Sequence, residues 1–163
     1  MLLNNNDYKL LVVCSALTLG SFTGGLLVSI SFIVAPFGYK DSDISLIISI
    51  IPITGGIGVY IGQIILKKTK AYKKFIMAII FMIPFILFLI IFMMETGSVW
   101  LTMLGFAVLG GVSLPIIPAF YEFSSELAFP VGEGSALGYL LGISSLIAFI
   151  CGILFSQFII GSV

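Results

Sequence analysis

Charged and metal-binding side chains are scarce in this chain of 163 residues. Only 9% of the residues are charged, and histidine is absent. A soluble domain carries about 25% charged residues, because they cover its surface. Here 60% of the residues are hydrophobic, and the mean hydropathy is +1.29. The surface must therefore face lipid, and we expect an integral membrane protein.

These absences also exclude several kinds of chemistry. The two cysteines, Cys14 and Cys151, both lie inside apolar runs, and we predict that they are small buried side chains. Without histidine or a zinc-type cysteine spacing, no metal or other cofactor is expected. The sequence offers no nucleophile–base pair, so an enzyme is disfavoured. The net charge is zero, so no basic surface is expected to bind nucleic acid.

What the chain does contain is five long stretches without charge. A helix needs about 20 apolar residues to cross a hydrocarbon core of roughly 30 Å. In lipid, each backbone polar group of such a segment must be satisfied within the segment, which favours helices. We therefore predict one all-α bundle of five transmembrane helices. Their expected ranges are 10–35, 44–66, 75–94, 99–121 and 134–160.

The lysines predict the orientation of these helices. Five of the seven lie in the segment KKTKAYKK, residues 67–74. The positive-inside rule places this loop in the cytoplasm, which leaves Lys9 inside and Lys40 outside. Anchoring the topology would explain the loop by itself. The alternative is that the basic residues bind lipid headgroups.

Glycine spacing predicts how the helices pack. Glycines four residues apart share one helix face, and such faces let helix backbones approach closely in membranes. Three spans carry this pattern: Gly20 and Gly24, Gly58 and Gly62, and Gly134, Gly138 and Gly142.

The fourth span is the first place to look for a functional site. Pro115 and Pro118 interrupt its backbone hydrogen bonds and predict a kink. Glu122 follows directly, and Glu126 lies one turn later on the same face. Since an ionisable group in a span usually faces a cavity or a partner, both are substrate or gating candidates. Alternatively, Glu122 simply marks the cytoplasmic interface.

Other small and polar side chains of the spans are candidates for a substrate cavity, although hydrogen bonds between helices would explain the hydroxyl groups equally well. These candidates are Ser21, Gly25, Ser29, Tyr121, Tyr139 and Ser145.

Two segments resemble a known family of carriers. The first, from Pro36 to Lys74, contains a basic inner loop with a Thr-Lys-x-Tyr-Lys core, and its motif residues are Lys67, Lys68, Thr69, Lys70, Tyr72 and Lys73. The second, from Phe120 to Leu141, matches at Glu122, Phe123, Glu126, Phe129, Pro130, Glu133 and Gly134. Together they resemble the C-terminal half of major facilitator superfamily transporters. More narrowly, they look like the carriers related to the feline leukaemia virus subgroup C receptor, and their lysosomal relative called disrupted in renal carcinoma.

The resemblance implies that the five helices correspond to spans seven to eleven of a twelve-span secondary transporter of small organic solutes. The partner would then be the N-terminal half of the same transporter, and the chain is expected to be a fragment. The alternative is a non-transporting remnant or assembly subunit. Family members carry choline, ethanolamine, haem or pyridoxine-like vitamins, in the plasma membrane or an organelle membrane. The tyrosine and glutamine that contact choline in some members fall near Leu26 or Leu27 and near Ser145, so this aromatic cage is not expected here.

Overall fold

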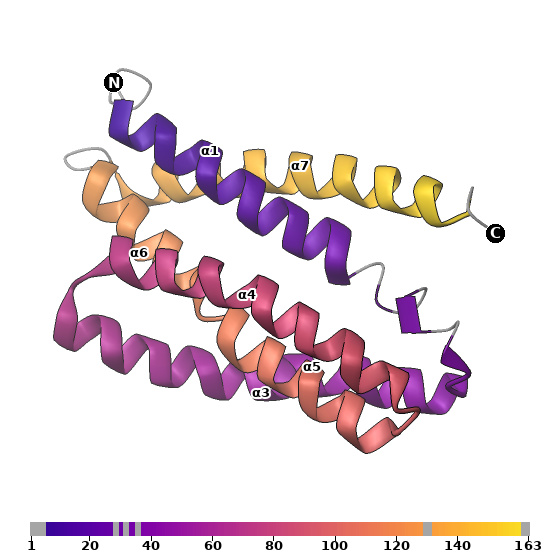
Figure 1. Ribbon diagram of the computed structural model, residues 1–163. Helices are drawn as coiled ribbons and strands as arrows, with labels where there is room; N and C mark the ends of the chain where they lie inside the picture. The colour runs from indigo at the N-terminus through magenta and orange to yellow at the C-terminus, as the bar shows by residue number, and fades with distance from the viewer. Residues whose placement is uncertain (1–5, 28–29, 31–32, 35–36, 129–131, 161–163) are drawn as a thin grey trace. The chain divides into compact units, whose positions relative to one another are not determined.

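The computed structural model describes residues 6–27, 30, 33–34, 37–128 and 132–160 (Figure 1). Within these ranges the regular secondary structure is helical, which confirms the predicted all-α class. Four described helices are long and apolar enough to cross a membrane. They are α3 (Asp41–Thr69), α4 (Tyr72–Glu95), the continuous run Val99–Ala128, and α7 (Glu133–Ile160). The chain is therefore a multi-pass membrane protein.

Two of the expected spans are divided into shorter helices. The first begins with α1 (Asn6–Gly20) and continues as a π-helical segment, η2 (Ser21–Leu27). The run Val99–Ala128 contains α5 (Val99–Ser113) and α6 (Ile116–Ala128). The chain packs as two compact units. Unit 1 contains Met1–Ile30 and Phe120–Val163, and unit 2 contains Ser31–Ala119.

In unit 1, α1 and η2 run parallel to α7 (Figure 1). At the beginning of both helices, the Tyr8 hydroxyl donates a hydrogen bond of 2.8 Å to the Ala136 carbonyl oxygen. Further along, a Cβ atom added to Gly20 would lie only 2.7 Å from Ile147 Cγ2. A Cβ atom on Gly24 would overlap the Ala148 backbone. The predicted close approach at these two glycines is confirmed.

The same prediction is wrong for the glycines of α7. A Cβ atom added to Gly134, Gly138 or Gly142 would meet nothing within 4 Å among the described residues. The reason is that α7 packs through its opposite face, where Ala136 and Leu140 are buried. Spacing alone identified a face of small residues, but it did not identify the face that meets α1.

The cysteine prediction also needs a correction, because Cys14 is exposed and Cys151 is only half-buried. Cys14 lies on the side of α1 that carries the exposed residues Leu10, Val13 and Leu17, away from α7. An apolar residue of a span can face lipid as readily as a helix neighbour, so apolar surroundings in the sequence do not predict burial.

In unit 2, α3 and α5 run parallel, and α4 returns between them in sequence (Figure 1). Two acids, Asp41 and Asp43, lie in the first turn of α3, where their negative charges interact favourably with the positive end of the helix dipole. The helix ends at Lys70, which adopts a left-handed conformation with φ of 50° and donates its N–H to the Leu66 carbonyl. This αL ending reverses the chain within two residues, so that Tyr72 already begins α4.

Tyr39 holds three segments together at the end of unit 2 opposite the Lys70 turn. Its hydroxyl lies 2.8 Å from Thr102 Oγ1 and donates to the Met94 carbonyl oxygen at 3.4 Å. Thr102 is buried near the start of α5, and Met94 lies at the end of α4. One side chain therefore links the segment before α3 to both following helices.

Removing this hydroxyl should destabilise unit 2 measurably. We expect Tyr39→Phe to lower the free energy of unfolding by about 1 kcal/mol, since the buried Thr102 hydroxyl loses its closest side-chain partner. Denaturant titration of the purified chain in detergent would measure this change. Tyr60→Phe is the matched control, because Tyr60 is exposed on α3. An equal effect of both substitutions would contradict the assigned role of Tyr39.

Candidate functional site

The break between α5 and α6 separates the candidate acids from the helix that precedes them. Pro115 has no N–H group, so it cannot donate to the Gly111 carbonyl as a helical residue would. Pro118 likewise leaves the Leu114 carbonyl without its usual helical donor. Instead, the Ile117 N–H donates to that carbonyl at 3.1 Å in a tighter turn. The predicted interruption is thus located at residues 114–115.

Two glycines of α3 contact this break, which lies within unit 2. A Cβ atom on Gly58 would overlap the Gly111 carbonyl oxygen, the acceptor freed by Pro115. A Cβ atom on Gly62 would lie 2.9 Å from Pro115 Cβ. The absence of side chains at these two positions lets α3 support the broken turn directly. A contact between a glycine Cα–H group and a carbonyl oxygen is weakly favourable in such helix crossings.

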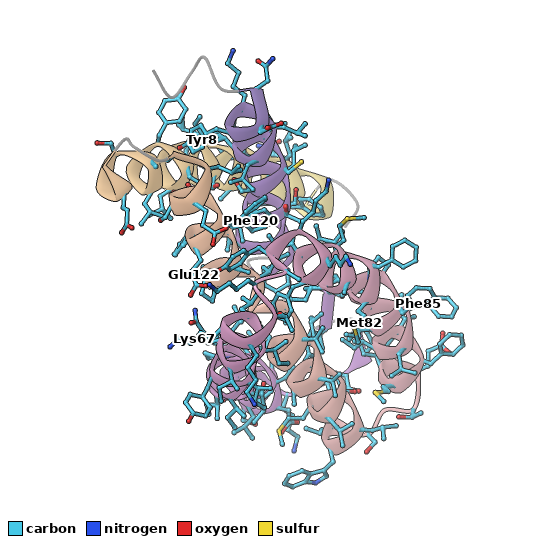
Figure 2. The ribbon with its side chains drawn as sticks, turned by 90° about the vertical axis from the view of Figure 1, so that its left-hand side faces the viewer. Tyr8, Lys67, Met82, Phe85, Phe120 and Glu122 are labelled. Carbon is cyan, nitrogen blue, oxygen red and sulfur yellow. The ribbon has the colours of Figure 1, made fainter. Side chains whose placement is uncertain are left out.

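The helix α6 beyond the break has a buried face and an acidic face. Phe120, Ser124 and Ala128 are spaced by four residues and are buried. Glu122 and Glu126 follow at helical positions on the opposite side, where Glu122 is half-buried and Glu126 is exposed. Figure 2 labels Glu122 and the buried Phe120. We expected the fourth span to end at residue 121, but α6 continues to Ala128. The helix continues because its buried face still has neighbours to contact in unit 1.

Tyr8 is the centre of these contacts. Its side chain is 0% exposed and packs with Val12, Ala128 and Ala136, so that it joins α1, α6 and α7 (Figure 2). Tyr8 had no role among the sequence predictions, because it precedes the first uncharged stretch. The buried positions that follow it along α1 are Leu11, Val12, Ser15, Ala16 and Leu19. The exposed residues Leu10, Val13 and Leu17 are equally apolar, so the sequence does not distinguish the buried face of α1.

Ser144 was also missed. It lies on the buried face of α7, and its hydroxyl has no hydrogen-bond partner among the described residues. Ser15 is buried on α1 and donates to the Val12 carbonyl of its own helix at 2.9 Å. With Ser124 of α6, the three α-helices of unit 1 therefore each bury a serine.

The remaining cavity candidates are dispersed over unit 1. Ser21 is exposed on η2, and Gly25 belongs to the same segment. Tyr121 is half-buried on α6, whereas Tyr139 and Ser145 are exposed on α7. Ser29 lies outside the described residues. Among the described residues, no hydrogen bond joins these candidates to one another, and their grouping around a substrate stays a prediction.

The residues of the two sequence motifs have clear positions. The lysines at 67, 68, 70 and 73 are exposed, Thr69 Oγ1 donates to the Ile65 carbonyl at 2.8 Å, and Tyr72 starts α4. Glu133 is the acid in the first turn of α7, and Gly134 is exposed beside it. Pro130 lies outside the described residues. Across the described part of the chain, no group of three His, Cys, Asp or Glu side chains is placed to hold a metal ion.

Comparison with known proteins confirms the predicted resemblance. The chain is 29% identical over 140 residues to the choline/ethanolamine transporter flvcr2a of Danio rerio, covering 85% of the chain and 30% of that protein. It is 26% identical over 155 residues to the choline/ethanolamine transporter FLVCR2 of Homo sapiens, covering 95% of the chain and 29% of that protein. The chain is thus similar to these transporters over most of its own length. It spans about 30% of the length of these relatives. No protein-family profile matches the chain.

Proposed function

We propose that the chain forms part of the C-terminal half of a major facilitator-type secondary transporter, which moves a small organic solute across a membrane. The observation that carries this proposal is the similarity to choline/ethanolamine transporters over 85% of the chain or more. The apolar helices and the parallel packing of α1 with α7 and of α3 with α5 fit such a half-bundle.

In this proposal the transporter works by rocking one half against the other around a midplane site. The chain would supply five of the six spans of the C-terminal half. The N-terminal half would come from the remainder of the transporter. Choline and ethanolamine are the first solutes to test, because the relatives are named for them. Leu26, Leu27 and Ser145 stand where the resemblance places choline contacts, so this protein would hold a cation through other groups.

Glu122 and Glu126 would act as the gate at the cytoplasmic end. Glu122 is half-buried on α6, seven residues after Pro115 in the broken turn. A carboxylate in this position can exchange partners when α6 changes its angle to α5, and the broken turn is where such a change costs least.

Substitution of Glu122 tests the proposal. In a transporter that contains this chain, we expect Glu122→Gln to lower uptake of radiolabelled choline by about tenfold, since a group that stabilises one conformation loses its charge. Glu95→Gln is the matched control, because Glu95 ends α4 in unit 2 and takes no part in the proposed gate. Unchanged uptake in Glu122→Gln would remove Glu122 from the mechanism. If the transporter took up neither choline nor ethanolamine, the non-transporting alternative would be favoured.

A further inference from the structure

The lysine cluster, formed by Lys67, Lys68, Lys70, Lys73 and Lys74, is exposed without exception. Two of these lysines lie in the last turn of α3, and two lie in the first turn of α4. Only two residues separate the helices, so all five ammonium groups gather at one end of unit 2. Figure 2 shows Lys67 projecting from this end of α3.

No carboxylate of unit 2 neutralises the lysine cluster. The acids of this unit are Asp41 and Asp43 at the start of α3 and Glu95 at the end of α4. They lie at the opposite end, since the 29 residues of α3 extend over about 43 Å. The two lysines of the first turn of α4 also stand at the positive end of that helix dipole, where a cation is unfavourable. Within unit 2 the cluster is therefore a concentrated positive charge without a carboxylate beside it, and it would attract an external anion.

The face of α4 below these lysines is apolar and open. We call the aromatic strip the exposed residues at helical spacing on this face: Met77, Phe81, Phe85, Phe88 and Phe92. Phe81 is 74% exposed and Phe85 is 68% exposed, and their ring centroids lie 6.3 Å apart. Figure 2 shows Phe85 pointing away from the neighbouring helices. The opposite face of α4, which carries Ile79 and Ile86, is buried.

Lys74 and the aromatic strip lie on the same side of α4, because Lys74 precedes Met77 by three residues and Phe81 by seven. The whole strip, from Met77 to Phe92, extends over about 22 Å. Its part nearest the lysines, from Met77 to Phe85, extends over about 12 Å, which is close to one leaflet of a hydrocarbon core of roughly 30 Å. A ligand that matches both parts needs an anionic head and an apolar chain of this length. A soluble anion matches only the first part.

We propose that the lysine cluster binds the phosphate-bearing headgroup of an anionic phospholipid in the cytoplasmic leaflet, and that the aromatic strip binds its acyl chain. The cytoplasmic position follows from the lysine bias of the whole chain. This site uses none of the gating residues of α6, and it does not depend on the transported solute. Topological anchoring alone would require the charges but would give no preference among lipids.

Native mass spectrometry of the purified full chain in detergent tests this inference. We expect the chain to retain phosphatidylserine about tenfold more than phosphatidylcholine, and Lys73→Gln/Lys74→Gln to reduce that preference by about tenfold. The double variant keeps three lysines of the cluster, so the positive-inside bias persists. Lys9→Gln/Lys40→Gln is the matched control, with two lysines removed elsewhere, and it should retain the full preference.

The apolar half of the site is tested separately. Phe81→Ala/Phe85→Ala should lower phosphatidylserine retention by at least about threefold, because the rings contact the acyl chain. Equal retention of both lipids by the unaltered chain would overturn the proposal. So would an equal loss in the control variant. Displacement of phosphatidylserine by millimolar inorganic phosphate would also overturn it, since the cluster would then bind a soluble anion.

Discussion

Gly58→Ala should destabilise unit 2 by about 2 kcal/mol, because the new methyl group would overlap backbone atoms that cannot move independently. The added Cβ atom would collide with the Gly111 carbonyl group at the crossing of α3 and α5. By contrast, Gly55 faces the flexible side chain of Leu114, which can adopt another rotamer. Gly58 is therefore the position of α3 where even alanine is poorly tolerated.

The matched control for Gly58 lies on the same helix. A Cβ atom on Gly56 would meet nothing within 4 Å among the described residues. Gly56→Ala should leave stability unchanged or raise it by up to about 1 kcal/mol, since alanine favours the helix. Denaturant titrations of both variants in detergent would compare the free energies of unfolding. A loss in Gly56→Ala equal to that in Gly58→Ala would contradict the packing described for α3 and α5.

Tyr8→Ala should have an effect of about 3 kcal/mol on unit 1, because the side chain is wholly buried where three helices meet. The loss has two parts: the ring leaves a cavity, and the Ala136 carbonyl loses a hydrogen bond of 2.8 Å. Tyr8→Phe isolates the second part, and we expect it to lower the free energy of unfolding by about 1 kcal/mol.

Tyr60→Ala is the control for the larger substitution, since Tyr60 is 70% exposed and its removal leaves no cavity. Titration with urea or a denaturing detergent, monitored by far-ultraviolet circular dichroism, would report the unfolding of all three variants. If Tyr8→Ala and Tyr60→Ala proved equally stable, Tyr8 would not be the connection among α1, α6 and α7.

The sequence predicted a role for only one of these two residues. Gly58 was expected in a close helix contact, because Gly58 and Gly62 share one face at helical spacing. The structure supplied the partner, the carbonyl freed by Pro115. Tyr8 had no predicted role, because it precedes the uncharged stretch and both faces of α1 are apolar, so no pattern marks its buried side.

The candidate acids were also only partly predictable. The prolines indicated an interruption before Glu122, and the structure locates it at residues 114–115. The half-burial of Glu122 and the exposure of Glu126 depend on which side of α6 meets α1 and α7. Their transport role stays a prediction, which the Glu122→Gln variant tests in a transporter that contains this chain.

The scarcity of charge determined by itself that this protein is a multi-pass helical membrane protein, because composition and segment length follow directly from the thickness of the bilayer. The motifs similarly determined the resemblance to major facilitator carriers related to the feline leukaemia virus subgroup C receptor. Only the tertiary structure decided which face of each helix is buried. In lipid an outward face is as apolar as an inward one, so the hydrophobic pattern that reveals the core of a soluble protein is weak here. That is why Gly24 packs closely, Gly142 is open and Cys14 is exposed.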